Sequence, residues 1–411
     1  MSILRPFLAR VIRHGQLTVL SPDGSSESFG APAAGYPEVT VRFTTRKGMR
    51  RIILDPRLGA AEAFMDGEME IVQGDIMELI GLLRANTPWD RGAKLKDKTA
   101  LGEWIEGVKT RLNSINRRRS SRANVAHHYD IGNDLYRLFL DSDMQYSCAY
   151  WPRPDMTLEE AQAAKKAHIA AKLALAPEQR VLDIGCGWGG MAITLAQLER
   201  VEVLGITLSE EQLALARERA TAAGVADRVR FELIDYRDLA EREVGGFDRI
   251  VSVGMFEHVG AANFETFFRA CANLMTADGV MLLHTIGRFG KPGATDAFTR
   301  KYIFPGGYIP ALSETVAASE KSRLIVTDVE TLRLHYARTL RQWYARTLAH
   351  RDEIVAMMDE RFYRMWTFYL AGATAAFESG GMGHYQIQFP RSRHALPLTR
   401  DYMAEAEGHY L

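Results

Sequence analysis

Cysteine is scarce in this sequence. The 411 residues include only Cys148, Cys186 and Cys271, and their spacing matches neither a disulfide framework nor the paired cysteines of a zinc site. The sequence therefore excludes a disulfide-stabilised secreted domain, and we expect no metal site. A reducing cytoplasm fits this cysteine content.

Long apolar runs are absent as well. No run approaches the length of about 18 residues that a membrane-spanning helix requires. Arg5, Arg10 and Arg13 interrupt the N-terminal stretch, so it does not have the pattern of a secretory signal peptide. Apolar residues between Ile3 and Ile12 recur at helical spacing. This spacing predicts a helix that either lies at a membrane interface or docks onto its own domain.

A net charge of either sign is also missing, because 51 Lys and Arg balance 51 Asp and Glu. The charge is nevertheless uneven, since residues 91–122 contain ten basic and three acidic residues, a local charge of +7. This basic strip, which includes Arg117–Arg119, would suit an anionic surface such as phospholipid or nucleic acid. A solvated linker helix explains the strip equally well.

The length of the chain predicts two domains rather than one core. Residues 1–90 have the pattern of a small α+β domain, with short strands expected at 39–45 and 50–55 and an amphipathic helix within 74–86. No catalytic constellation occurs there. Residues 91–122 are expected to form a basic helical connector to the rest of the chain.

Residues 123–411 alternate strands with helices. Strands are expected at 179–185, 201–208, 228–235, 247–256, 279–287, 323–330 and 384–390. This spacing is typical of an α/β fold with a doubly wound, mostly parallel, seven-stranded Rossmann-like sheet. An aromatic, glycine-rich insert at 290–321 interrupts the pattern, and such insertions usually shape a substrate pocket.

A glycine-rich turn follows the first of these strands. The sequence VLDIGCGWGG places Asp183, Gly185, Gly187 and Gly189 between a strand and a helix. The spacing differs from the G-x-G-x-x-G of dinucleotide enzymes, and no Lys-Ser/Thr follows as in a phosphate loop. Glycines allow a ligand to approach the backbone, and the aspartate could hold an ammonium or a water. The pattern suits the methionyl end of S-adenosylmethionine; a merely tight turn is the alternative.

The adenosine end of that ligand would lie over the next strand ends. An acid commonly holds the ribose there, but this chain has Thr207, so Thr207 and Gln212 would act instead or the ribose is held differently. After the third strand, Asp235, Tyr236 and Arg237 are candidates for an adenine pocket. Asp235 could equally cap a helix, and Ser209 with Gln212 predicts a capping box.

The segment Asn124–Trp151 combines two adjacent histidines, four tyrosines and a cysteine. It could be an aromatic core segment, a metal site or the lid of an active site. A metal site at His127 and His128 is disfavoured, because adjacent side chains seldom converge without distant partners.

Several motifs together point to one family. They are YDIGNDLYRLFLDSDMQYSCAYW, VLDIGCGWGG, GITLSEEQ, VSVGMFEHVG, LLHTIG and KYIFPGGYIP, in this order. Between Asn124 and Phe389 the chain thereby resembles the cyclopropane-fatty-acid synthases, S-adenosylmethionine-dependent enzymes that act on unsaturated acyl chains of membrane phospholipids. The resemblance implies a methyltransferase catalytic domain at 123–411. It also implies a lipid-associated domain at 1–90.

The resemblance also implies roles for single residues. The segment around Tyr146 and Ser147 would cover S-adenosylmethionine and touch it. A bicarbonate ion would serve as the base, held by Cys148 and Ile286 through their backbones and by Glu257, His284 and Tyr336 through their side chains. Nothing in such a reaction requires Cys148 as a covalent nucleophile.

The chemistry requires a cation to be stabilised in a dry, apolar site. Aromatic faces can do this, and the candidates are Tyr146, Tyr150, Tyr302, Phe304 and Tyr336. An acyl-chain tunnel could be lined by 302–312 and by Phe362, Trp366, Tyr369 and Leu370, although core packing explains these residues equally well.

The sequence thus predicts a cyclopropane synthase acting on unsaturated phospholipid. A cytoplasmic location, peripheral at the inner face of the membrane, and a possible homodimer complete the expectation. A related lipid C-methyltransferase giving a methyl-branched product, a small-molecule methyltransferase and a lipid carrier remain alternatives. A nucleic-acid methyltransferase is disfavoured because the N-P-P-Y type motif of amino-group methylation is absent, so no nucleic-acid partner is expected.

Overall fold

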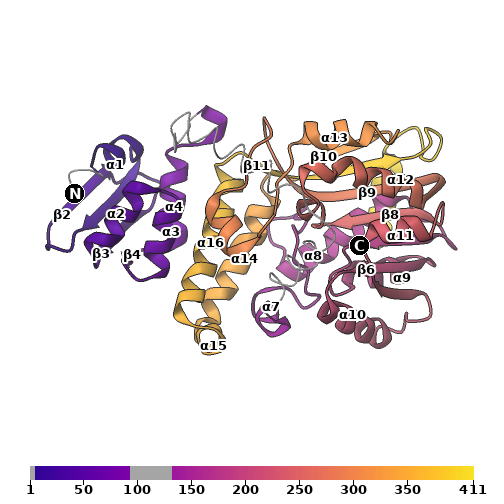
Figure 1. Cartoon of the computed structure of the whole chain (residues 1–411), viewed down its shortest axis with the longest axis horizontal. Helices are drawn as coiled ribbons and strands as arrows, with labels where there is room; N and C mark the ends of the chain where they lie inside the picture. Colours follow the sequence, from indigo (N-terminus) through magenta and orange to yellow (C-terminus); the bar gives the residue numbers. More distant parts are fainter. Residues whose placement is uncertain (1–4, 93–131) are drawn as a thin grey trace. The chain divides into compact units, whose positions relative to one another are not determined.

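The computed structural model describes residues 5–92 and 132–411 (Figure 1). Contacts between Cα atoms group the chain into two compact units. Of the described residues, the first unit holds 5–92, 295–305 and 337–382, and the second holds 132–294, 306–336 and 383–411. The expected boundaries 1–90, 91–122 and 123–411 stay a prediction, because packing does not test which segments fold independently. Arg117–Arg119, His127 and His128 lie outside the described residues.

A four-stranded sheet and its helices form the first unit. Its elements are α1 (Arg5–Val11), β1 (Gly15–Leu20), β2 (Ser26–Ala31), β3 (Glu38–Phe43), α2 (Arg46–Leu54), α3 (Leu58–Met65), β4 (Met69–Gln73), α4 (Ile76–Ala85), η1 (Trp89–Arg91), the π-helix η4 (Thr299–Ile303), most of α14 (His335–Ala349), α15 (Arg351–Met357) and α16 (Glu360–Glu378). The strand order is β2-β1-β3-β4, and α16 packs against α3 and α4. The helix expected within 74–86 is confirmed as α4, which begins at a capping box of Asp75 and Glu78.

The expectation of a strand at 50–55 is wrong, because these residues belong largely to helix α2. The side chain of Thr45 caps this helix by accepting the N–H of Gly48. Gly48 also lets the helix approach the chain just before β4, since a Cβ there would lie 2.9 Å from Glu68. The cap and this close approach favour a helix over the strand that the apolar pattern indicated.

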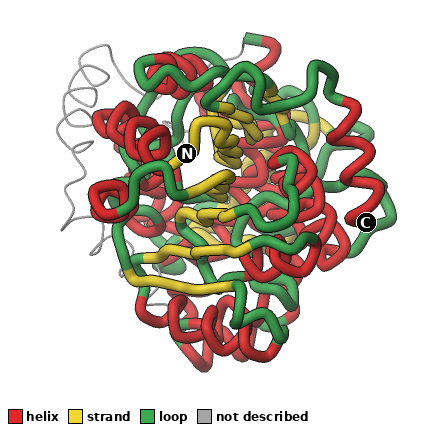
Figure 2. Tube along the Cα trace, turned by 90° about the vertical axis from the view of Figure 1, so that its right-hand side faces the viewer, coloured by secondary structure: helices red, strands yellow, loops and turns green. Residues whose placement is uncertain are grey.

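A seven-stranded sheet with helices on both faces forms the second unit (Figure 2). Its elements are α7 (Asn133–Phe139), α8 (Leu158–Leu173), β5 (Arg180–Ile184), α9 (Gly190–Leu198), β6 (Glu202–Thr207), α10 (Glu210–Ala222), β7 (Val229–Leu233), α11 (Tyr236–Arg242), β8 (Phe247–Val253), η2 (Phe256–His258), η3 (Ala261–Asn263), α12 (Phe264–Leu274), β9 (Met275–Arg288), α13 (Leu312–Glu320), β10 (Asp328–Thr331), β11 (Met382–Pro390) and α17 (Asp401–Tyr410). The strand order is β10-β11-β9-β8-β5-β6-β7. Strands β5 to β9 pair in parallel, whereas β10 and β11 are antiparallel. The predicted α/β fold is confirmed.

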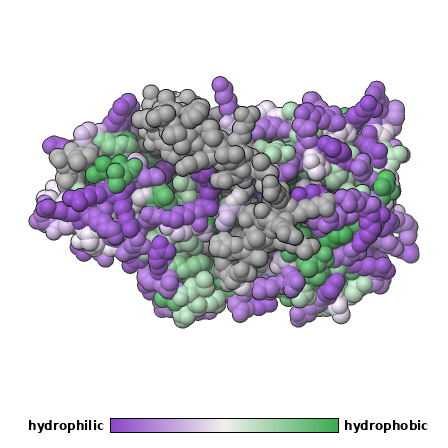
Figure 3. Space-filling view, viewed as in Figure 1, coloured by the Kyte–Doolittle hydropathy of each residue, from purple (hydrophilic) through white to green (hydrophobic). Residues whose placement is uncertain are grey.

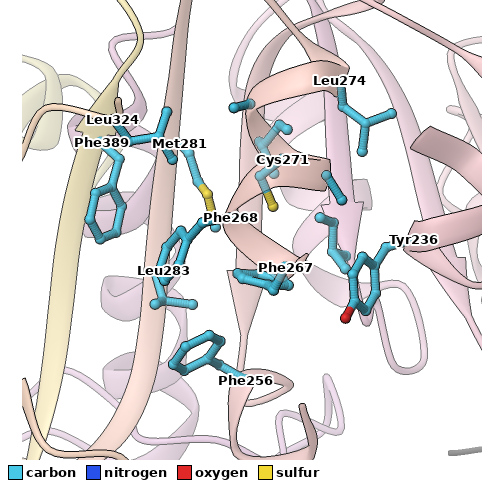
Figure 4. Packing of buried hydrophobic residues seen from close by; sticks show 14 of the residues in the cluster. Tyr236, Phe256, Phe267, Phe268, Cys271, Leu274, Met281, Leu283, Leu324 and Phe389 are labelled. Carbon is cyan, nitrogen blue, oxygen red and sulfur yellow. The ribbon is translucent and has the colours of Figure 1, made fainter. Parts of the chain in front are cut away.

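Two hydrophobic clusters lie on opposite faces of this sheet. One cluster joins the strands to α11, α12 and α13 and contains Phe256, Phe267, Phe268, Met281 and Phe389 (Figure 4). The other joins them to α8, α9 and α10 and contains Val181 and Leu282. Because side chains alternate along a strand, Asp183 and His284 face the same side as Val181 and Leu282, toward α8.

The surface combines charged residues with isolated apolar ones. On the face shown in Figure 3, hydrophobic residues form separate patches among hydrophilic ones. Helix α1 buries Leu8 and Val11, which accounts for part of the apolar N-terminal pattern by docking. Within residues 5–92 and 132–411, no helix combines the length and apolarity required to cross a bilayer.

Candidate active site

Polar side chains gather where the parallel strands end. Asp183 lies near the end of β5, Thr207 ends β6, His284 lies in β9, and Glu257 follows β8 in η2. The carboxyl ends of parallel strands meet at one edge of a sheet, where ligands of such folds bind. All four side chains are buried, so their polar atoms need partners from the protein or from a ligand.

The glycine-rich turn after β5 combines close packing with open space. Gly185, Gly187 and Gly189 all have positive φ, at 81°, 53° and 82°. A Cβ at Gly189 would lie 2.7 Å from the ring of Phe231, whereas nothing lies within 4 Å of a Cβ at Gly187. The turn is therefore anchored at Gly189 and leaves room for a ligand at Gly187.

Alanine substitutions should separate these two glycines. We expect Gly189→Ala to lower the free energy of unfolding by about 2 kcal/mol or more, because it adds overpacking to left-handed strain. Gly187→Ala should cost only about 1 kcal/mol but should weaken binding of S-adenosylhomocysteine. Denaturant titration and calorimetry measure the two effects. Unchanged affinity in Gly187→Ala would contradict a ligand at this turn.

Asp183 has the environment of a ligand-binding carboxylate. Its side chain is 1% exposed, and neither carboxylate oxygen has a hydrogen-bond partner among the residues that the structure describes. Burial raises the pKa of Asp183 to about 7, and the nearby Lys165 opposes the shift. Burying such a group without a partner is costly. An ammonium group or a bound water is the complementary partner.

Helix α8 holds the segment around Tyr146. Nζ of Lys165 donates to Oε1 of Gln145 at 2.5 Å and to Oγ of Ser147 at 2.9 Å. Gln162, one turn earlier, donates to the backbone carbonyls of Gln145 and Ser147. Burial lowers the pKa of Lys165 to about 8. These bonds fix the backbone from which Tyr146 and Ser147 project.

Further contacts join this segment to the glycine-rich turn. Arg219 of α10 pairs with Asp143 and donates to the carbonyl of Trp188 at 2.7 Å. The indole N–H of Trp188 donates to Asn133 of α7 at 2.8 Å, and the ring of Tyr136 lies 5.1 Å from that of Trp188. The segment expected to cover the cofactor thus packs beside the turn, although the cover role stays a prediction.

Thr207 and Gln212 bond to each other at the end of β6. The hydroxyl of Thr207 donates to Oε1 of Gln212 at 2.9 Å and accepts the backbone N–H of Ser209. Ser209 in turn accepts the N–H of Gln212 at 3.3 Å, so only the Ser209 half of the expected capping box is observed. The ribose role of Thr207 and Gln212 stays a prediction.

Asp235 caps α11, as the alternative interpretation proposed. It accepts the backbone N–H of Arg237 at 2.9 Å and the Nε of the same residue at 2.8 Å. The Tyr236 ring packs edge-on against Phe267 and lies beneath the Arg237 guanidinium. The three candidates for the adenine pocket are therefore mutually ordered, and their role toward adenine stays a prediction.

Glu257 is oriented through one of its two oxygens. Oε1 accepts the backbone N–H of Ile286 at 2.6 Å, whereas Oε2 is buried and has no hydrogen bond within the described part of the chain. Burial raises the pKa of Glu257 to about 7, and the Ile286 N–H opposes the shift. The backbone N–H of Tyr308 donates to the Glu257 carbonyl at 2.8 Å. Glu257 is therefore a fixed carboxylate, and its Oε2 is the oxygen available to a ligand.

His284 lies two residues before Ile286 on β9. Its Nδ1 is 3.2 Å from Nε2 of Gln386, and its own Nε2 has no partner in residues 5–92 or 132–411. The ring centroid of His384 lies only 3.9 Å from that of His284. Burial and the adjacent His384 hold the pKa of His284 well below its usual value. The imidazole is therefore neutral at neutral pH.

Cys148 is buried, and its thiol donates to the carbonyl of Ala149 at 3.3 Å. Burial raises the pKa of the thiol, so a thiolate is disfavoured at neutral pH. This environment agrees with an expected contribution through the backbone rather than through sulfur.

Tyr150 is sandwiched between two imidazoles. Its ring stacks on His168 at 4.1 Å and on His335 at 5.2 Å, with interplanar angles below 10°. Nδ1 of His335 accepts the backbone N–H of Trp151 at 2.9 Å. Burial alone would lower the pKa of His168, but hydrogen bonds to two carboxylates outweigh burial and raise this pKa above its usual value. The segment that contains Tyr150 and Trp151 is thereby tied to the residue that precedes Tyr336.

The aromatic candidates for cation stabilisation fall in both units. Tyr146, Tyr150 and Tyr336 belong to the second unit, and Tyr302 and Phe304 to the first. Tyr336 packs edge-on against His384, and the hydroxyl of Tyr302 donates to Glu62 at 2.9 Å. Within the first unit, Trp366 and Leu370 are completely buried, as core packing requires. The cation-stabilising and tunnel roles stay predictions.

Four buried polar residues near these candidates were not predicted. They are Gln162 and Lys165 on α8 and His384 and Gln386 on β11. The sequence does carry a signal for His384 and Gln386. The stretch HYQIQFP alternates polar and apolar residues, and the structure buries both kinds along strand β11. Among the residues that the structure describes, no cluster of His, Cys, Asp or Glu is suited to hold a metal ion.

Comparison with known proteins decides the family. The model of the family described as mycolic acid cyclopropane synthetase matches residues 116–387. The cyclopropane-fatty-acyl-phospholipid synthase of Escherichia coli (strain K12) is 38% identical over 362 residues, which cover 88% of this chain and 90% of that protein. The chain belongs to this family.

Two further comparisons support the assignment. A probable fatty acid methyltransferase of Pseudomonas putida is 38% identical over 351 residues, covering 83% of this chain and 85% of that protein. The crystal structure of mycolic acid cyclopropane synthase CmaA1 complexed with SAH and CTAB aligns with a TM-score of 0.61 at 35% identity, over 66% of this chain and 98% of that chain. The chain is therefore an S-adenosylmethionine-dependent methyltransferase of this family.

Proposed function

We propose that this protein transfers a methylene carbon from S-adenosylmethionine to the cis double bond of an unsaturated phospholipid acyl chain, giving a cyclopropane fatty acid. The observation that carries the proposal is a pair of buried side-chain atoms, Oε2 of Glu257 and Nε2 of His284, that have no hydrogen-bond partner among the described residues. His284 belongs to β9, and Glu257 accepts a hydrogen bond from Ile286, two residues further along the same strand. The Escherichia coli relative, named a cyclopropane-fatty-acyl-phospholipid synthase, supports the same activity.

The residues at the glycine-rich turn fit S-adenosylmethionine. Asp183 would accept the ammonium of its methionyl group, since both carboxylate oxygens lack partners among the described residues. The space at Gly187 would accommodate the ligand, and Tyr146 and Ser147 would contact it from the covering segment. When bound, S-adenosylmethionine supplies an electrophilic methyl group that adds to one alkene carbon.

The polar groups at β9 suit a bicarbonate ion, which when bound supplies a base for the proton that leaves the added methyl group. Glu257 would accept the hydroxyl of the ion through Oε2, while His284 and Tyr336 would donate to its other oxygens. Cys148 and Ile286 would line the ion with their backbones. A carboxylate at the cation itself could form an ester, so Glu257 serves better to orient the base than to act as the base.

The substrate side of the proposal rests on apolar and basic residues. Two or three of the aromatic candidates would face the cation, each contributing about 1 kcal/mol or more in a dry site. The basic strip at 91–122 would hold the protein at the inner face of the membrane, where each charge contributes up to about 1 kcal/mol. Residues 1–90 would contact lipid and form a homodimer.

A lipid C-methyltransferase that gives a methyl-branched chain is the second candidate. The Pseudomonas putida relative, named a probable fatty acid methyltransferase, favours it at the same 38% identity. The two activities share the methyl donor; ring closure follows loss of a proton from the added methyl group, whereas a saturated methyl branch requires a reduction that adds two further hydrogens. A small-molecule methyltransferase has less support, because the names of the Escherichia coli and Pseudomonas putida relatives both refer to fatty acids.

Incubation with lipid tests the proposal. The full chain is mixed with vesicles of monounsaturated phospholipid and methyl-labelled S-adenosylmethionine, in CO2-free buffer with or without sodium bicarbonate. We expect label in the acyl chains and much faster incorporation with bicarbonate. A protein that binds S-adenosylhomocysteine yet never labels the acyl chains would refute the proposed function.

A further inference from the structure

A glutamine on the neighbouring strand contacts the candidate histidine of the site. Gln386 lies on β11, which neighbours β9 in the sheet, and its side chain is completely buried. Its Nε2 lies 3.2 Å from Nδ1 of His284. The Oε1 of Gln386 has no hydrogen bond to any described residue. The side chain therefore makes one polar contact in the described chain, and that contact is with His284.

The chemistry of this contact determines where the imidazole proton lies. A carboxamide NH2 group can only donate, so Nδ1 of His284 must accept. A neutral imidazole carries a single N–H, and the proton then lies on Nε2. Burial and the neighbouring His384 keep the His284 ring neutral at neutral pH. No residue in the described chain competes for Nε2.

We propose that Gln386 is a positioning residue that fixes His284 in the tautomer with its proton on Nε2, and so makes that atom a donor toward a bound anion. This inference rests on the proposed function, because His284 is the histidine expected to hold bicarbonate. The site then offers a donor at His284 and an acceptor at Oε2 of Glu257. A bicarbonate ion, with a hydroxyl and two anionic oxygens, matches this combination.

The opposite tautomer would give a different site. With the proton on Nδ1, Nε2 of His284 would be an acceptor beside the acceptor Oε2 of Glu257. Two acceptors suit an anion poorly, because only one of them can be satisfied by the single bicarbonate hydroxyl. The orientation of Gln386 thus selects between an anion-binding and an anion-repelling arrangement of the same side chains.

Nitrogen NMR of the imidazole tests the proposal on the full chain without substrate. Long-range proton–nitrogen spectra of 15N-histidine-labelled protein distinguish protonated from unprotonated ring nitrogens, and a His284→Asn variant identifies the signal. In the unsubstituted protein we expect a protonated Nε2 and an unprotonated Nδ1 at neutral pH. A proton on Nδ1 would overturn the proposal, whatever the variants show.

Substitution of Gln386 should change the tautomer. In Gln386→Glu, studied at alkaline pH so that the buried carboxyl is ionised, the carboxylate can only accept, so we expect the proton to move to Nδ1 and the bicarbonate concentration for half-maximal activity to rise at least about tenfold. Gln388→Leu is the matched control, since Gln388 is equally buried on the same strand and bonds to Lys172 and Tyr402 instead. It should leave the His284 spectrum unchanged.

The outcomes separate this inference from the proposed function. A His284 spectrum in Gln386→Glu identical to that of the unsubstituted protein would overturn the positioning role. A reversed tautomer with unchanged bicarbonate dependence would overturn the link to anion binding. If the His284 tautomers are as expected but bicarbonate has no effect on activity, bicarbonate is refuted as the base. The assignment of the imidazole proton to Nε2 would still hold.

Discussion

Glu257→Gln is expected to reduce turnover by a factor of about 10²–10⁴, the usual contribution of a general base, because Glu257 holds the bicarbonate that acts as the base. The glutamine keeps an oxygen that can accept the Ile286 N–H, now bonded to Glu257 at 2.6 Å. It replaces the second oxygen, Oε2, by an NH2 group that cannot accept the hydroxyl of bicarbonate. Initial-rate measurement with lipid vesicles gives the turnover, and calorimetry with S-adenosylhomocysteine gives the cofactor affinity.

The cofactor affinity of Glu257→Gln should stay within about twofold, because Asp183 and the glycine-rich turn are untouched. Glu265→Gln is the control for loss of a carboxylate, since Glu265 lies on α12 and pairs with Lys321 at the surface. Its activity should equal that of the unsubstituted protein. Full activity in Glu257→Gln would refute the role of Glu257 in orienting the base.

Asp183→Asn is expected to weaken binding of S-adenosylhomocysteine by a factor of about 10–100, as for loss of a hydrogen bond to a charged group worth roughly 1.5–3 kcal/mol. The same substitution should stabilise the ligand-free protein. Burial raises the pKa of Asp183 to about 7, so the folded state disfavours the ionised carboxylate. Stability is lost as pH rises between about 4 and 7, and the cost reaches about 4 kcal/mol above that window.

Calorimetry and thermal unfolding at several pH values check both effects of Asp183→Asn. The melting temperature of the ligand-free variant should exceed that of the unsubstituted protein by several degrees at pH 8, with a smaller gain at pH 5. Asp248→Asn is the control, because Asp248 lies near the amino end of β8 and accepts the Arg180 N–H at 3.0 Å. It should leave the affinity unchanged. An Asp183→Asn variant with lower stability and normal affinity would show that the carboxylate is structural.

The catalytic-domain sheet could be predicted because its signals are local. The strand, turn and helix of VLDIGCGWGG follow from an apolar run, three glycines and another apolar run, and the structure gives all three glycines positive φ. Strands β1 and β2, which follow the helical pattern that ends at Ile12, were not predicted. Strand β1 also depends on parallel pairing with β3, a contact distant in sequence. Helix α2 was mistaken for a strand because its cap at Thr45 outweighs the apolar run.

The site was predictable only where a motif marks it. Asp183, Glu257 and His284 occur in recognisable motifs, and the structure places them on or just after the neighbouring strands β5, β8 and β9. Lys165 gave no comparable signal, because α8 contains several charged residues and only its packing over the sheet shows which of them are buried. Gln386 likewise depends on the contact between β11 and β9. Electrostatic partners of this kind follow from tertiary packing rather than from local sequence.

The fate of the hydrogens on the transferred carbon tests the central claim most directly. The full chain is incubated with monounsaturated phospholipid vesicles and S-adenosylmethionine carrying a fully deuterated methyl group, and the acyl chains are analysed by mass spectrometry. Cyclopropane formation predicts a product that retains two deuterium atoms, because one leaves with the base before the ring closes. A product that retains all three deuterium atoms, or a methyl-branched product whose mass shows two further hydrogens added by reduction, contradicts the account.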